Sequence, residues 1–232
     1  MPTRNNNKEP LNTCYASTYD EIGIDEAGRG PMLGRVYSAA VILPREEGEF
    51  KHELMKDSKR FSSEKKIRET ANYIKEKAIA WGIGYATEEY IDKHNIRQAT
   101  FYAMHDAIKT VLSKLKDDNN TLLLVDGNDF KPYTVFCETN GITQIPHVCI
   151  TGGDNKYTSI AAASILAKVS RDEYIEDLCE QDKSLDERYG IMKNKGYGTK
   201  IHMEGIAKYG ISKYHRGTFG NCRLHTSSAK QS

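Results

Sequence analysis

Short, continuously apolar runs recur along the chain and predict buried β-strands. They occupy residues 21–25, 36–43, 79–86, 121–125 and 144–150. Their lengths suit ordinary strands, and continuous apolar runs are typical of strands that are buried on both faces. The sequence therefore predicts a central five-stranded sheet.

Longer stretches between these runs predict helices. Residues 64–78 follow a serine that can cap a helix, and an acidic residue stands in the first turn. Residues 96–115 place apolar side chains at helical spacing. Residues 159–179 begin with a run of alanines, whose small side chains would let that helix lie close against a sheet.

The order of the elements predicts an α/β fold with a mixed sheet flanked by helices. The first two strands follow each other like a hairpin, whereas later strands alternate with helices. From about residue 185 the chain is rich in glycine and tyrosine, so we expect a small C-terminal extension with short helices at most. We expect one domain at residues 19–222, a polar tail at 1–18 and another at 223–232.

Composition narrows the class of protein. No apolar run approaches the ~20 residues that cross a bilayer, and the N-terminus lacks the apolar core of a signal peptide. The five cysteines form no CxxC pair, which argues against a zinc or disulfide framework and favours the cytoplasm. The net charge of +1 excludes a globally basic nucleic-acid binder, so such binding requires a local patch.

Acidic residues stand at the ends of predicted strands. Asp25 and Glu26 end the first strand, Asp126 ends the fourth, and Asp154 follows the last. Alone, each could serve a turn, and Asp154 could also cap the next helix. Together they could converge on one rim of the sheet, where their repulsion would be relieved by two divalent cations with oxygen ligands.

The segment Gly28-Arg29-Gly30 follows the first acidic pair. Glycines let backbone N–H groups approach a phosphate, and a guanidinium can bind it. A dinucleotide-binding loop is the alternative, but such a loop opens a helix. Here Pro31 interrupts and residues 36–43 predict a strand, so we reject that alternative.

Seven motifs, in order, give the chain a resemblance to the ribonuclease HII family. They are GIDEAGRGP (23–31), DSK (57–59), VDGN (125–128), GGD (152–154), AAASILAKVSRD (161–172), KGYGT (195–199) and HRGTF (215–219). The resemblance covers most of the chain. It implies an RNase H-like fold and a monomeric endonuclease. Such an enzyme hydrolyses the RNA strand of RNA/DNA hybrids and incises 5′ of ribonucleotides embedded in duplex DNA, leaving 5′-phosphate and 3′-hydroxyl ends.

The resemblance also implies residue roles. Asp25, Glu26 and Asp126 would bind Mg²⁺ or Mn²⁺, and Asp154 would complete the catalytic carboxylates. Other residues would contact the substrate, at its sugars or at its phosphates. Gly28, Arg29 and Gly30 would sense the ribonucleotide at its 2′-hydroxyl, Tyr197 would stack on the next sugar, and Lys59 and Lys168 would support phosphates or the acids.

Some residues depart from the family pattern, and for others the sequence leaves two possible roles. Arg35 stands where the family more often has proline, and the segment around Asp154 lacks the usual lysine before GD. His215 and Arg216 could contact phosphate or pack the C-terminal segment against the domain. The alternatives to this enzyme are a non-catalytic hybrid binder and another nuclease with the same fold.

Overall fold

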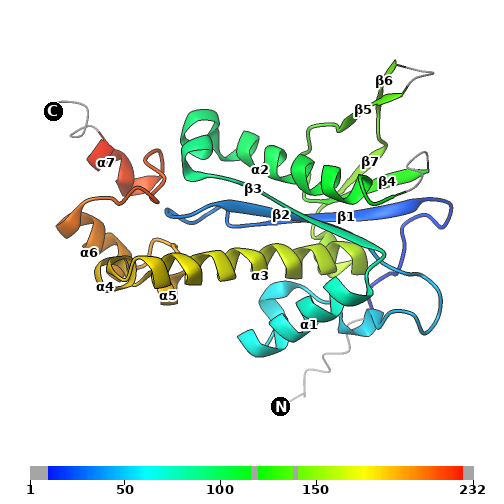
Figure 1. Ribbon diagram of the computed structural model, residues 1–232, viewed down its shortest axis with the longest axis horizontal. Coiled ribbons are helices and arrows are strands. Elements are labelled where there is room, and N and C mark those ends of the chain that lie inside the picture. Colours follow the sequence, from blue (N-terminus) through cyan, green and yellow to red (C-terminus); the bar gives the residue numbers. More distant parts are fainter. Residues whose placement is uncertain (1–9, 116–119, 138–140, 227–232) are drawn as a thin grey trace, which may run out of the picture.

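A mixed five-stranded sheet forms the centre of the computed structural model, which describes residues 10–115, 120–137 and 141–226 (Figure 1). Its strand order is β3-β2-β1-β4-β7. The strands are β1 (Asp20–Ala27), β2 (Val36–Ile42), β3 (Ala80–Ala86), β4 (Thr121–Asp126) and β7 (His147–Ile150). β1 pairs antiparallel with β2 but parallel with β4, so the predicted mixed sheet is confirmed.

Helices cover both faces of this sheet (Figure 1). They are α1 (Glu64–Lys77), α2 (Glu88–Leu112) and α3 (Thr158–Gln181), with α2 on one face and the other two on the opposite face. The side chains of β1 alternate between the two sides: Ile22 and Ile24 belong to the apolar cluster under α2, whereas Gly23 faces α3. The same alternation places Asp25 on the α3 side.

The helix α3 lies in direct contact with β1. A Cβ atom at Gly23 would stand 2.2 Å from the carbonyl carbon of Ser159, and Ala161, Ala162 and Ala163 are fully buried. The small residues of its first turns therefore permit the close approach that the sequence predicts.

Helix α2 begins at Glu88 rather than at the predicted residue 96. Thr87 caps this earlier start, accepting a hydrogen bond from the N–H of Tyr90 at 3.2 Å. Asn95 interrupts the helix with φ 68° and ψ 163°, and its Oδ1 accepts from the N–H of Gln98 at 3.1 Å. The predicted start at residue 96 thus directly follows the cap of the second helical segment.

The predicted strand over residues 144–150 is divided. Its first residue belongs to a two-stranded hairpin of β5 (Thr134–Cys137) and β6 (Gly141–Gln144), and β7 begins only after Pro146. Phe136 and Ile142 of the hairpin are each 77% exposed. The hairpin lacks the buried apolar run by which the other strands could be predicted.

The C-terminal extension forms one end of the molecule, beside the end of α3 (Figure 1). It contains α4 (Ser184–Tyr189), α5 (Ile191–Asn194), α6 (Lys200–Tyr209) and α7 (Arg223–Thr226). Its Leu185, Tyr189 and Ile206 belong to a small apolar core that also includes Leu33 and, from α3, Ile175. Helix α6 is longer than the short helices predicted there, and Thr199 caps its start by accepting a hydrogen bond from the N–H of His202.

Short 3₁₀ helices complete the described structure: η1 (His52–Leu54), η2 (Ser58–Arg60), η3 (Gly153–Asn155) and η4 (Gly220–Cys222). Before β1, Asn12 exchanges backbone hydrogen bonds with Lys156 and Thr158. Part of the segment assigned to the N-terminal tail thus lies against the domain, while residues 1–9 and 227–232 fall outside the described residues.

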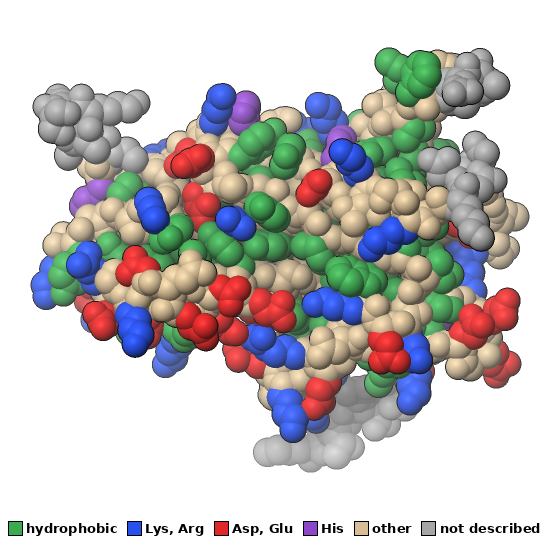
Figure 2. Space-filling view, in the orientation of Figure 1, with side chains coloured by type: hydrophobic (Ala, Val, Ile, Leu, Met, Phe, Trp, Pro, Cys, Tyr) green, Lys and Arg blue, Asp and Glu red, His purple; other side chains and the backbone are tan. Residues whose placement is uncertain are grey.

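Basic and acidic side chains are interspersed on the face shown in Figure 2, in agreement with the small net charge. Charge recognition must therefore come from local arrangements. Among the described residues, no helix is both long and apolar enough for a transmembrane segment.

Candidate active site

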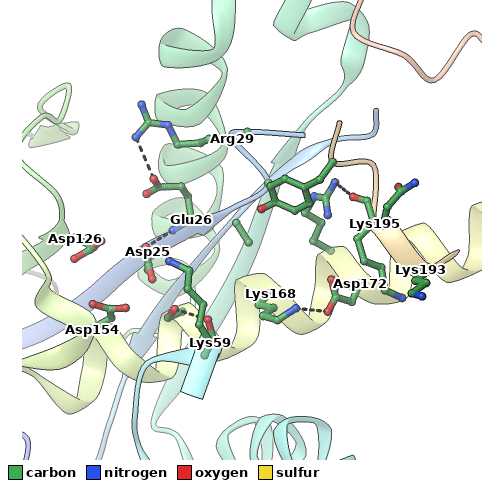
Figure 3. A pocket seen from close by; sticks show the side chains of 18 residues that line it. Asp25, Glu26, Arg29, Lys59, Asp126, Asp154, Lys168, Asp172, Lys193 and Lys195 are labelled. Carbon is green, nitrogen blue, oxygen red and sulfur yellow. Dashed lines mark hydrogen bonds and ion pairs between the residues drawn. The ribbon is translucent and has the colours of Figure 1, made fainter. Parts of the chain in front are cut away.

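The four predicted acids line one pocket of about 590 Å³ at the ends of neighbouring elements, and Asp172 of α3 is a fifth acid in its lining (Figure 3). Asp25 and Glu26 lie at the end of β1, Asp126 ends β4, and Asp154 lies in η3. Because β1 and β4 are parallel neighbours, their carboxyl ends meet at the same edge of the sheet. The structure therefore brings together all four predicted acids.

Asp25 is the most deeply buried of the four, with 6% of its surface exposed. Burial raises its pKa well above the usual value, and the charges of Glu26 and Asp126 raise it further. The hydroxyl of Ser164 and the N–H of Glu26, which donates to Asp25 Oδ1 at 2.7 Å, act in the opposite direction. These donors favour the ionised carboxylate, although its neighbours disfavour it.

The GGD motif positions the carboxylate of Asp126. The N–H of Gly153 donates to Asp126 Oδ1 at 2.6 Å, and Gly152 has the left-handed φ of 65° that favours glycine. A Cβ at Gly153 would stand 2.6 Å from Ile160 Cδ1, so a larger residue here would require the end of that side chain to move. Burial raises the pKa of Asp126 despite the hydrogen bond.

The carboxylate oxygens of the four acids are the kind of ligand that binds a hard divalent cation. Burial raises the pKa of Glu26 as well, and Asp126 adds to this effect, so the acids interact electrostatically. A cation would relieve that repulsion. As they stand, no three acid, histidine or cysteine side chains in the described part of the chain surround a single point. Ligation by three of these acids therefore requires their side chains to rotate inward.

Basic side chains occupy the other part of the pocket (Figure 3). The sequence identified Lys59 and Lys168, and the structure adds Lys193 and Lys195. Lys168 Nζ lies 2.5 Å from Asp172 Oδ2, which ties it to its own helix. Lys59 lies within η2, and its charge lowers the pKa of Glu26.

The glycine-bracketed arginine and the tyrosine of KGYGT lie side by side. A Cβ at Gly30 would stand 3.5 Å from Tyr197 Cε1, and 51% of the tyrosine is exposed. Arg29 Nη1 contacts Glu26 Oε1 at 3.2 Å, which connects this group to the acids. The predicted sensing residues thus border the same pocket as the predicted metal ligands.

Several residues around the pocket were not identified from the sequence as site residues. Ser58 and Ser164 are buried beside the acids and lie 3.1 Å apart. Their small polar side chains carry no distinctive sequence signal.

The sequence left two roles open for His215 and Arg216, contact with phosphate or packing of the C-terminal segment. Both side chains are buried, with 4% and 0% exposed, so the packing role is correct and direct contact with phosphate is wrong.

Comparison with known proteins assigns the family. The family model described as Ribonuclease HII matches residues 22–222. The chain belongs to the ribonuclease HII family. A ribonuclease HII of Parabacteroides distasonis is 46% identical over 199 residues, which cover 86% of this chain and 89% of that protein. Membership makes the chain a ribonuclease H, a nuclease that hydrolyses phosphodiester bonds.

Solved structures share the ribonuclease H fold of this chain. The ribonuclease H2 from Pyrococcus horikoshii OT3 is similar with a TM-score of 0.66 at 20% identity, covering 91% of this chain and 99% of that one. Bst-RNase HIII, solved in complex with Mn²⁺, gives a TM-score of 0.67 at 17% identity, covering 93% of this chain and 71% of that one. The RNase H-like fold expected from the sequence is confirmed.

Proposed function

We propose that this ribonuclease HII family member hydrolyses the RNA strand of RNA/DNA hybrids and incises 5′ of ribonucleotides embedded in duplex DNA. The products are 5′-phosphate and 3′-hydroxyl ends. One observation carries the proposal: the four acids share a pocket with Gly28, Arg29, Gly30 and Tyr197. A site for hydrolysis and a site for sugar recognition therefore adjoin.

Asp25, Glu26 and Asp126 are the proposed metal ligands, and Asp154 is the fourth catalytic carboxylate. Carboxylate oxygens suit Mg²⁺ or Mn²⁺. When bound, such ions supply a nucleophile at neutral pH and stabilise charge on the phosphate. The protein contributes the converging strand ends, and the hydrogen bond from Gly153 fixes the direction of Asp126.

The selection of a ribonucleotide is assigned to the loop at residues 28–30 and to Tyr197. The 2′-hydroxyl distinguishes RNA from DNA at a given position, and a backbone N–H can donate to its oxygen. Tyr197 has the exposed ring needed to stack on the adjacent sugar, where it would disfavour a second 2′-hydroxyl. Lys59 and Lys168 are assigned to phosphate contacts or to support of the acids.

The decisive test uses a DNA duplex with one ribonucleotide and either Mg²⁺ or Mn²⁺. We expect incision 5′ of the ribonucleotide, while the matched all-DNA duplex stays intact. Binding without cleavage in either metal would instead support the non-catalytic binder. Equal cleavage of both duplexes would support a nuclease of different selectivity.

We also propose that the protein acts as a monomer in the cytoplasm. The scattered, odd-numbered cysteines support a reducing compartment. Sedimentation at the concentration used for cleavage tests the oligomeric state, and fractionation of the source cells tests the location.

A further inference from the structure

Arg216 is completely buried, and its guanidinium binds the loop that precedes β2. Its Nη2 donates to the carbonyl of Gly28 at 2.6 Å, Nη1 donates to that of Arg29 at 3.0 Å, and Nε donates to that of Gly34 at 2.8 Å. Three nitrogens of one side chain thus hold three carbonyls from a segment far away in the sequence. The rigid, planar guanidinium fixes the relative directions of these carbonyls.

The direction of these carbonyls determines the direction of the neighbouring N–H groups. The peptide bonds are trans, so the N–H of Arg29 points opposite to the carbonyl of Gly28. The N–H of Gly30 points opposite to the carbonyl of Arg29 in the same way. Within the described residues neither N–H donates a hydrogen bond, and both residues line the pocket. Arg216 therefore directs two free donors away from itself.

The neighbouring residue, His215, extends the same support to Tyr197. The N–H of Ser212 donates to His215 Nδ1 at 2.9 Å, so the proton of this neutral ring lies on Nε2. That nitrogen donates to His202 Nε2 at 3.0 Å, and His202 Nδ1 donates to the carbonyl of Tyr197 at 2.9 Å. The two buried imidazoles connect the C-terminal segment to the backbone of the tyrosine.

Backbone pairing joins the two supports. The N–H of Arg216 donates to the carbonyl of Met32 at 2.8 Å, and the N–H of Met32 donates to that of Gly196 at 2.8 Å. The segment at residues 214–216 is thus bonded to the chain that follows the loop, and this chain is bonded to the residue before Tyr197.

We propose that His215 and Arg216 are positioning residues for ribonucleotide selection. They hold the donors of residues 28–30 and the backbone of Tyr197 in one fixed relation, without touching the substrate. This inference rests on the proposed function, because selection at the 2′-hydroxyl is what the fixed geometry would serve.

The test compares Arg216→Gln and Arg216→Lys with the unchanged protein. Two quantities are measured: kcat/KM for a duplex with one ribonucleotide, and the affinity for the matched all-DNA duplex by fluorescence anisotropy. For Arg216→Gln we expect kcat/KM to fall about ten- to a hundredfold, because small misplacements of binding groups have effects of this size. The affinity for all-DNA duplex should stay within about twofold, since contacts outside the loop supply it.

Arg216→Lys keeps the charge but offers one nitrogen instead of three. Its kcat/KM should therefore lie between that of the unchanged protein and that of Arg216→Gln. If Arg216→Gln fails to fold, which thermal melting detects, Arg216→Lys still tests the inference. Arg188→Gln is the matched control, because Arg188 is an exposed arginine of the same C-terminal extension. It should leave both quantities unchanged.

The inference is overturned if both folded variants keep the original kcat/KM. It is also overturned if kcat/KM and the affinity for all-DNA duplex fall in parallel, because that pattern indicates a general structural role. Failure of the unchanged protein to incise would instead refute the proposed function.

Discussion

Asp25 occupies a position that disfavours its own charge. It is buried, and the charges of Glu26 and Asp126 raise its pKa further. Like charges about 4 Å apart repel by roughly 1 kcal/mol in bulk water and by roughly 4 kcal/mol at the dielectric constant of a protein surface. The arrangement therefore lowers stability in the absence of cations, and the proposed catalysis explains why it is present.

Replacing this carboxylate separates catalysis from stability. We expect Asp25→Asn and Asp126→Asn each to reduce incision of the single-ribonucleotide duplex by more than about a hundredfold, since metal ligands are lost. Without divalent metal, Asp25→Asn should unfold at the same or a higher temperature than the unchanged protein. Mg²⁺ should raise the melting temperature of the unchanged protein more than that of the variant. A variant with undiminished incision would remove Asp25 from the catalytic set.

Substitution of Tyr197 should change which substrate is preferred without removing the residues proposed for cleavage. Its ring is exposed beside Gly30, so removal should leave the acids in place. We expect Tyr197→Ala to weaken the preference for a single ribonucleotide over a long hybrid by about tenfold, the scale of one stacked base. Tyr197→Phe keeps the ring and should retain most of the preference. An unchanged ratio for Tyr197→Ala would show that the assigned role is wrong.

At the scale of elements, glycines set how closely helices approach the sheet. A Cβ at Gly84 in β3 would stand 2.2 Å from the carbonyl oxygen of Ala103 in α2. The apolar runs predicted the strands and helices, but glycine spacing alone could not reveal which helix would cover which strand. Similarly, the hairpin β5–β6 escaped prediction because its strands are short and exposed, and Pro146 divides the run that follows.

The contact between α2 and β3 can be tested by overpacking. We expect Gly84→Ala to lower the free energy of unfolding by about 1–3 kcal/mol, because backbone atoms must shift to admit the methyl group. Urea unfolding measures the change. A loss below about 0.5 kcal/mol, the usual effect of a surface substitution, would show that the contact yields easily.

The buried imidazoles link helix α6 to the C-terminal segment and make stability depend on pH. Burial lowers the pKa of His215 from 6.5 to about 3, with the charge of His202 adding to the effect. Between these values the unfolded chain binds a proton that the folded protein does not, so stability falls as the pH is lowered through this window. The slope for one proton is roughly 1.4 kcal/mol per pH unit.

Replacing the histidine should remove part of that slope. We expect the free energy of unfolding of His215→Asn to be lower than that of the unchanged protein at pH 7.5. Between pH 6.5 and 5 it should decrease less steeply, by about one proton. Urea titrations at several pH values supply both quantities. Identical slopes would show that His215 does not titrate in this way.

At the scale of the whole molecule, one edge of the sheet holds the acids, and the C-terminal extension lines another part of the same pocket with Lys193, Lys195 and Tyr197. The sequence motifs predicted the acids, the loop and Tyr197, because those residues carry recognisable chemistry. They left the role of Arg216 open between phosphate contact and packing, and they could not predict its partners, the carbonyls of Gly28, Arg29 and Gly34, because no side-chain pattern reports them. Only the folded chain brings these groups together.

The position of Arg216 after the four acids in the sequence has a consequence for synthesis. A ribosome completes all four acids before it reaches residue 160, and it adds the guanidinium that holds the loop only at residue 216. Until then the growing chain has the residues proposed for hydrolysis but lacks the segment proposed to position those for selection. The proposed discrimination between sugars therefore depends on residues that are added after those proposed for hydrolysis.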